Sequence, residues 1–211
     1  MDGTQRKKLL EIKKERKEEQ NMPKKKTKVD NYDDSWMYIL LLTTLTILTY
    51  SLATYTFKLT DIRLTYSIFL LPILYLISNY ITKKYGYGKT VLAISISSIS
   101  IVVFTLIMNF ALGKPTDINT FAGHFCALVV SHLINLLIYQ FLISNTKAPA
   151  VLIFLTYLFA LVTFYLFYTL IHLNMVALDN YWKGYFVTIG IQSLVCLVLT
   201  IIDKKINVGR E

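Results

Sequence analysis

The residues best suited to chemistry in this sequence are uncharged polar side chains that recur at intervals of three and four within long apolar stretches. The three sets are Tyr75, Ser78, Asn79 and Thr82; His132, Asn135 and Tyr139, with His124 and Ser131 beside them; and Thr188, Gln192 and Cys196. Residues at this spacing share one face of a helix, so each set predicts a polar stripe. Amide and imidazole groups offer both donors and acceptors. The stripes therefore suit an uncharged nitrogen heterocycle better than a strongly charged solute.

Two interpretations of these stripes stay open. Polar side chains inside a membrane are costly and usually face the interior of a helix bundle. There they form hydrogen bonds between helices, which contribute roughly 0.6 kcal/mol each. For any single serine or threonine we prefer this structural interpretation. For the set Asn79, His132, Asn135 and Gln192, a cavity that binds a solute is an equal alternative.

Motifs of soluble enzymes are absent from the sequence. It contains no glycine-rich phosphate loop, no His-Glu-x-x-His and no Gly-x-Ser-x-Gly. The expected membrane spans contain no carboxylate, which removes acid–base pairs and most metal sites. Cys126 and Cys196 form no Cys-x-x-Cys pair, so we interpret them as buried apolar residues. We therefore expect neither an enzyme nor a bound cofactor or metal.

Six stretches without Asp, Glu, Lys or Arg position these stripes. Of the 211 residues, 55% are hydrophobic, and nearly all the charge lies between the stretches and at the two ends of the chain. At about 1.5 Å rise per residue, such stretches cross the roughly 30 Å hydrocarbon layer as helices. The predicted spans are Ser35–Phe57, Leu64–Tyr80, Val91–Leu112, Phe121–Ile143, Ala148–Ile171 and Tyr185–Ile202. The sequence thus predicts an all-α polytopic membrane protein with six transmembrane helices in one domain, residues 35–205.

One stretch departs from the helical pattern. Isoleucine and serine alternate over Ile94–Ile101, as in a β-strand. A lone strand in lipid leaves its backbone groups without partners, so we expect helix there.

The basic residues predict the orientation of the spans. Eighteen Lys and Arg residues lie on the side that would hold both termini, and four lie on the other. Because cytoplasmic segments carry the excess of basic residues, we expect both termini in the cytoplasm of a multi-pass protein of the plasma or inner membrane. The net charge of +9 is then explained by topology, which argues against a nucleic-acid partner. No cleavable signal peptide is expected.

Two polar segments flank the predicted membrane domain. Residues 1–34 form a charged cytoplasmic leader, and residues 206–211 form a cytoplasmic tail. The basic run Lys24–Lys28 favours contact with anionic lipid. A docking site for a partner protein is the alternative role of the leader.

A segment after the start of the second span resembles a known family signature. Leu71–Thr90, LPILYLISNYITKKYGYGKT, resembles the signature of the VUT family of vitamin uptake and queuosine precursor transporters. The matching residues are Pro72, Tyr85, Gly86, Tyr87 and Lys89. The stretch Ser131–Phe141, SHLINLLIYQF, is similar to the family's fourth-helix pattern and matches it at Ser131. The segment Leu71–Thr90 also has a purely local interpretation. In that interpretation Gly86 or Gly88 takes a positive φ and ends the second predicted helix.

The resemblance implies a six-helix importer of a planar heterocycle such as a 7-deazaguanine, working as a monomer or small homo-oligomer. The predicted substrate-binding residues are Asn79, His132, Asn135 and Gln192, with Tyr75 and Tyr139 stacking on the ring. Two alternatives remain. One is a substrate-capture subunit of a multi-component vitamin transporter, and the other is a non-transporting membrane protein that contacts partners through its leader.

The sequence departs from the family at its acidic positions. The family's acidic pair falls on Asn79 and Lys83 here, and its fourth-helix Asp falls on Asn135. With no carboxylate in the expected spans, we expect passage down the solute gradient without proton coupling, and proton coupling through His132 is the alternative.

Overall fold

The computed structural model of this chain describes residues 34–53, 55–59, 62–113, 117–144, 150–172 and 178–208. Nearly all of the predicted leader and the last three residues of the predicted tail lie outside these ranges. In chain order the elements are α2 (Ser35–Leu52), β1 (Thr56–Leu59), β2 (Ile62–Thr65), η1 (Tyr66–Phe69), α3 (Leu70–Tyr85), α4 (Tyr87–Leu112), α5 (Ile118–Ser144), α6 (Ala150–His172) and α7 (Leu178–Val208). Helices α2, α4, α5, α6 and α7 are long and apolar enough to cross a membrane, as expected of a helical membrane protein.

Helix α3 lies at the centre of the bundle. It packs against each of α2, α4, α5, α6 and α7. With 16 residues it is shorter than these five helices. Its polar side chains Tyr75, Ser78 and Asn79 are fully buried. The surrounding helices therefore shield these polar side chains from the exterior.

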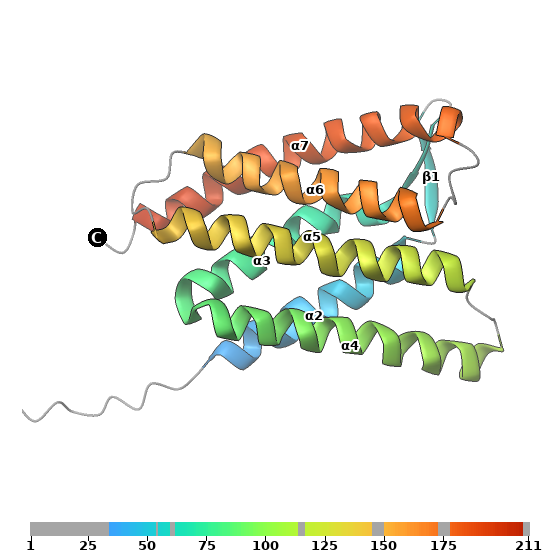
Figure 1. The fold of residues 1–211 in the computed structure, drawn as a ribbon, viewed down its shortest axis with the longest axis horizontal. Helices are drawn as coiled ribbons and strands as arrows, with labels where there is room; N and C mark the ends of the chain where they lie inside the picture. The colour runs from blue at the N-terminus through green and yellow to red at the C-terminus, as the bar shows by residue number, and fades with distance from the viewer. Residues whose placement is uncertain are drawn as a thin grey trace, which may run out of the picture. The chain divides into compact units, whose positions relative to one another are not determined.

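The helices alternate in direction, as Figure 1 shows. The start of α2 lies beside the end of α3, where Asp34 contacts Lys84. The ends of α5 and α7 also meet, where Tyr139 contacts Asp203, and Lys83 of α3 lies near that carboxylate. We call this end of the bundle the Asp34 end and the opposite one the hairpin end. Helices α3, α5 and α7 therefore run in the same direction, toward the Asp34 end.

A β-hairpin joins α2 to α3 and corrects the predicted spans. Strands β1 and β2 pair antiparallel, with Phe57 opposite Leu64. The predictions that the first span runs to Phe57 and that the second begins at Leu64 are therefore wrong. Both boundaries rested on the absence of charge, which does not distinguish helix from strand. The strands are rich in β-branched and aromatic residues, which favour a paired strand, and Leu64 is buried with 2% of its surface exposed.

A single glycine separates α3 from α4. Gly86 has a φ of 88°, and its N–H donates to the carbonyl of Thr82 at 2.9 Å. Across this turn the hydroxyls of Thr82 and Thr90 lie 2.9 Å apart. Because glycine adopts positive φ without strain, Gly86 ends α3 as predicted, whereas Gly88 lies inside α4.

The stretch with alternating isoleucine and serine is helical, as expected. Residues Ile94–Ile101 lie within α4, which continues for 26 residues. One face of this stretch is buried, including Ser97 and Ser98.

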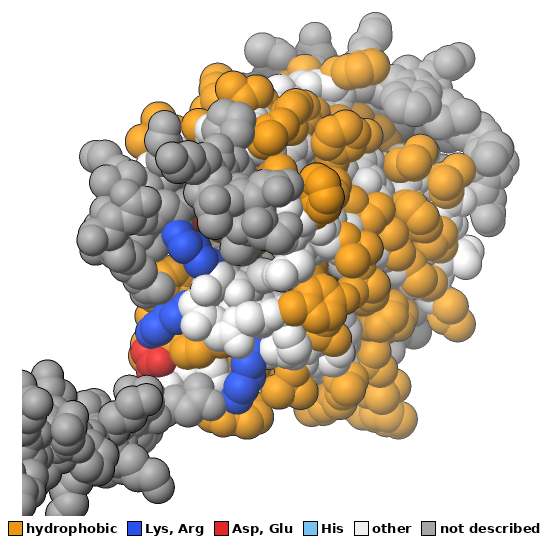
Figure 2. Space-filling view, turned by 60° about the vertical axis from the view of Figure 1, so that its left-hand side comes forward, with side chains coloured by type: hydrophobic (Ala, Val, Ile, Leu, Met, Phe, Trp, Pro, Cys, Tyr) orange, Lys and Arg blue, Asp and Glu red, His pale blue; other side chains and the backbone are white. Residues whose placement is uncertain are grey.

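The outward faces of the helices carry exposed apolar side chains. Phe110, Phe186 and Phe141 are exposed to 88%, 70% and 68%. Figure 2 shows hydrophobic side chains over much of the face in view, with basic and acidic side chains gathered toward its lower left. Apolar surface on this scale is unfavourable in water, so it fits contact with lipid.

Candidate functional site

Buried polar side chains from α3, α5, α6 and α7 lie in a line through the interior of the bundle. From the hairpin end to the Asp34 end they are Gln192, Tyr75 with His132, Asn79 with Asn135, Tyr157, and Tyr139 with Asp203. We call this set the polar track. On α3, α5 and α7 it arises because the polar residues share one helix face and the three helices run in the same direction, and α6, which runs the opposite way, adds Tyr157.

Asn79 and Asn135 form the centre of the polar track. Nδ2 of Asn135 donates to Oδ1 of Asn79 at 2.7 Å and to Oγ of Ser78 at 3.2 Å. All three residues are fully buried. Among the described residues, Nδ2 of Asn79 has no acceptor and Oδ1 of Asn135 has no donor. Because each carboxamide carries donors and an acceptor, the pair keeps one donor group and one acceptor group available inside the bundle.

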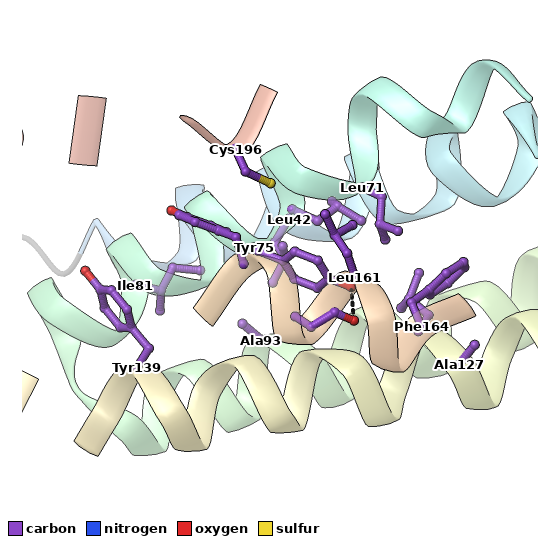
Figure 3. Packing of buried hydrophobic residues seen from close by; sticks show 14 of the residues in the cluster. Leu42, Leu71, Tyr75, Ile81, Ala93, Ala127, Tyr139, Leu161, Phe164 and Cys196 are labelled. Atoms are coloured by element: carbon purple, nitrogen blue, oxygen red, sulfur yellow. Dashed lines mark hydrogen bonds between the residues drawn. The ribbon is translucent and has the colours of Figure 1, made fainter. Parts of the chain in front are cut away.

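His132 and Tyr75 lie one helical turn toward the hairpin end. Their rings meet nearly edge to face, with centroids 5.0 Å apart. The hydroxyl of Tyr75 donates to the carbonyl of Ala160 at 3.4 Å, the bond drawn as a dashed line in Figure 3. Nδ1 of His132 is buried and has no partner among the described residues. The imidazole therefore adds a third available polar atom beside the amide pair.

Gln192 lies on α7 near the start of α3. Its Nε2 donates to the carbonyl of Ile68 in η1 at 2.9 Å. Its Oε1 is buried and has no donor among the described residues. Gln192 thus holds the short 3₁₀ helix against α7 and presents one acceptor, but it lies farther along the polar track than the amide pair.

Tyr139 has a different partner from the one we expected. Its hydroxyl lies 3.2 Å from both carboxylate oxygens of Asp203 on α7. In Figure 3 Tyr139 lies well apart from Tyr75, so the two predicted stacking residues do not face one another across a single site. The structure brings together four of the six predicted residues, as two adjacent pairs, and places Tyr139 and Gln192 at either end.

Asp203 overturns the expectation that the spans contain no carboxylate. The candidate span in α7 covers Gly184–Asp203, and Asp203 is only 4% exposed. The predicted span stopped one residue earlier because it ended at the first charged residue. A signal was present in the sequence, since Asp203 lies eleven residues after Gln192, or about three helical turns, on the face that also holds Cys196.

Tyr157 of α6 is a second residue that the sequence reasoning did not place in the site. It is fully buried. Its hydroxyl lies near Asn79 and Asp203 without making a hydrogen bond of good geometry to a described residue. Tyr157 therefore fills the polar track between the amide pair and the carboxylate.

Most single threonines and serines outside the polar track bond within their own helix. Thr46 donates to the carbonyl of Leu42 at 2.7 Å, four residues earlier, and Thr169 does the same to Tyr165. Thr43 also meets Ser97 of α4 at 3.1 Å. The prediction that such residues bond between helices is therefore wrong for most of them, because a serine or threonine hydroxyl readily donates to a carbonyl one turn earlier in its own helix.

A charged cluster lies outside the polar track at the Asp34 end. Nζ of Lys84 lies 2.6 Å from Oδ2 of Asp34, and the hydroxyl of Tyr85 donates to Oδ1. The ammonium also lies 5.1 Å from the ring centroid of Tyr38. The hydrogen bond from Lys84, with a second from Tyr85, lowers the pKa of Asp34 below its usual 3.8.

Of the two cysteines, only Cys196 is buried as the sequence interpretation expected. Cys196 is buried and Cys126 is partly buried, and both are free thiols. Within the described ranges, no group of three or more His, Cys, Asp or Glu side chains could hold a metal ion.

Comparisons with known proteins identify no relative. A scan against protein-family models, a search of curated proteins and a search of solved structures each find no match to this chain.

Proposed function

We propose that this protein is a membrane importer of a small, uncharged, planar nitrogen heterocycle. The pair of Asn79 and Asn135 carries the proposal. A buried polar group without a partner costs about 1–3 kcal/mol. The pair nonetheless keeps a donor and an acceptor side by side. The edge of a purine-like ring presents the complementary acceptor and donor, so binding such a ring would recover this free energy.

The neighbouring residues fit the same kind of solute. Nδ1 of His132 lies one turn from the amide pair, and Oε1 of Gln192 lies beyond it. None of these groups carries a fixed charge, so they favour a neutral solute over an ion. The aromatic rings of Tyr75 and Tyr157 supply apolar faces on which a planar ring can stack.

The proposal includes six spans with both termini in the cytoplasm. Together η1 and α3 run from Tyr66 to Tyr85. At about 2.0 Å per 3₁₀ residue and 1.5 Å per α-helical residue they extend about 32 Å, close to the thickness of the hydrocarbon layer. A sixth crossing puts the start of α2 and the end of α7 on one side. That side holds eighteen of the Lys and Arg residues, which favours the cytoplasm.

The proposal differs from what the VUT resemblance alone implies at two positions. Asn79 and Asn135 occupy positions where that family carries acidic residues, and here they bond to each other. An amide at each position keeps the geometry for hydrogen bonding but removes the charge. We therefore include a 7-deazaguanine among the cargoes to be tested.

Counterflow in proteoliposomes tests the function. Vesicles holding the purified full-length chain are preloaded with unlabelled 7-deazaguanine or hypoxanthine, and entry of the labelled compound is measured. We expect labelled compound to enter faster than into vesicles that hold Asn135→Ala. Equal rates in both, and in empty vesicles, for every purine-like and vitamin-like probe would contradict the proposal. Copurification of an ATPase required for entry would instead indicate a substrate-capture subunit.

A further inference from the structure

We propose that Asp203 is a proton-carrying residue that couples solute movement to a proton, with Tyr139 holding its carboxylate in place. This inference rests on the proposed transport function. It replaces our sequence-based expectation of uncoupled passage, because that expectation assumed spans without a carboxylate.

The position of Asp203 is unusual for an acidic residue in a membrane helix. It lies inside the bundle at the end of the candidate span, with 4% of its surface exposed. The hydroxyl of Tyr139 lies 3.2 Å from both carboxylate oxygens of Asp203. Its single O–H is therefore one hydrogen-bond donor shared between two acceptors. A carboxylate has about four acceptor positions. Among the described residues, the hydroxyl of Tyr139 is the donor with good geometry to Asp203, and ionisable residues inside a membrane bundle commonly mark ion and proton pathways.

The groups around Asp203 come from three helices. Lys83 of α3 lies close enough to interact with the carboxylate electrostatically. Tyr139 of α5 donates to it, and Tyr157 of α6 lies beside it. On α7 itself, Lys204 and Lys205 follow in the sequence. The other elements packed against α7 are β2 and η1, which lie at the hairpin end. The charge on Asp203 therefore helps to hold α3, α5 and α7 together at the Asp34 end.

The coupling step moves one proton and no electrons. A proton binds one oxygen of Asp203, an O–H bond forms, and the carboxylate becomes a neutral carboxylic acid. The attraction to Lys83 is lost, and the new O–H of the carboxylic acid can donate a hydrogen bond to the hydroxyl oxygen of Tyr139. Release of the same proton to water restores the carboxylate. Protonation thus weakens the contacts that close the Asp34 end of the bundle.

The polar track links this step to the solute. Asn79 lies one helical turn from Lys83 on α3, and Asn135 lies one turn from Tyr139 on α5. Tyr157 lies between the amide pair and Asp203. A solute bound at the amide pair and a proton on Asp203 therefore both change the contacts of the same segments of α3 and α5. Two sites are coupled when each ligand changes contacts that the other also depends on.

The first experiment measures protonation without any cargo. Infrared difference spectra are recorded between acidic and alkaline samples of the full-length protein in liposomes. We expect a carbonyl band of a carboxylic acid shielded from water, which is lost in Asp203→Asn and retained in Asp117→Asn. Asp117 is exposed at the hairpin end, where it caps α5, and asparagine caps a helix as well as aspartate does. A spectrum of Asp203→Asn identical to that of the wild type would overturn the proposal.

The second experiment measures coupling. Labelled 7-deazaguanine is offered to proteoliposomes with and without an imposed pH gradient. We expect the wild type to accumulate the probe above equilibrium only with the gradient, and Asp203→Asn to keep counterflow but reach no more than equilibrium. Tyr139→Phe should lower accumulation while keeping counterflow. Counterflow without gradient-driven accumulation in the wild type, or full accumulation in Asp203→Asn, would overturn the coupling and leave the proposed function intact. Absence of counterflow with every probe would overturn the proposed function, and the infrared result would still decide whether Asp203 titrates.

Discussion

Nδ2 of Asn135 on α5 lies 2.7 Å from Oδ1 of Asn79 on the central helix α3. This bond joins two helices that are each surrounded by apolar side chains, and both residues are fully buried. It uses only one donor and one acceptor of the four groups that the two amides offer. The pair is therefore a contact between helices that leaves one donor group and one acceptor group without a partner among the described residues, and our proposal of solute binding rests on these two groups.

Asn135→Ala should reduce entry of a purine-like probe by at least about tenfold, since one bond to the solute is lost and the orientation of Asn79 is no longer fixed. The amount of protein in the membrane should stay near the wild-type level, because a bond between membrane helices contributes only about 0.6 kcal/mol on average. Uptake and membrane content are measured on the same vesicles.

Ser97→Ala is the matched control for this prediction. It removes a buried contact between helices, the 3.1 Å bond to Thr43, outside the polar track. We expect it to leave uptake unchanged. If Ser97→Ala and Asn135→Ala reduce uptake equally, the amide pair has only a structural role.

Gln192→Ala should also reduce uptake, through the position of η1. The change removes the 2.9 Å bond to the carbonyl of Ile68 and leaves that carbonyl without this donor. We expect faster proteolysis or hydrogen exchange in residues 62–69 together with slower uptake. Gln192→Glu, which keeps an acceptor but loses the donor, should show the same increase in exchange. Slower uptake with unchanged exchange would assign Gln192 to solute contact alone.

The helical stripes could be predicted from the sequence because each depends only on spacing within one helix. Tyr75, Ser78 and Asn79 were expected on one face and are all fully buried. The sequence could not show which stripes meet, since that depends on how α3, α5 and α7 pack. Tyr139 therefore bonds to Asp203 rather than lining the same site as Asn79.

The wrongly placed span boundaries share one cause. The predicted spans began and ended at charged residues, so the first span ran into β1 and the last stopped before Asp203. In the structure a helix end is set by backbone geometry, as at Gly86 with its φ of 88°. A charged residue can continue a helix, as Asp203 does within α7. Local backbone signals would have served better than charge at these boundaries.

Reporter fusions test the six-span topology. A reporter after Glu211 should give a cytoplasmic signal, and one inserted between residues 114 and 117, after α4, should give the opposite signal. If α3 does not cross the membrane, both signals exchange sides. A C-terminal reporter on the outer side would therefore contradict six spans and would make α3 a helix enclosed within the bundle at one side.

The last prediction concerns the pH dependence of stability at the Asp34 end. Lys84 and Tyr85 hold the pKa of Asp34 below its usual value. A lowered folded-state pKa adds stability above the unfolded pKa of about 3.9 and loses it as pH falls through the folded value. Wild type should therefore unfold at a higher temperature than Asp34→Asn at neutral pH, and the difference should disappear at strongly acidic pH. In a Lys84→Gln background, Asp34→Asn should have little effect. A difference that persists unchanged into acid, or in that background, would show that the ion pair does not tie α2 to α3.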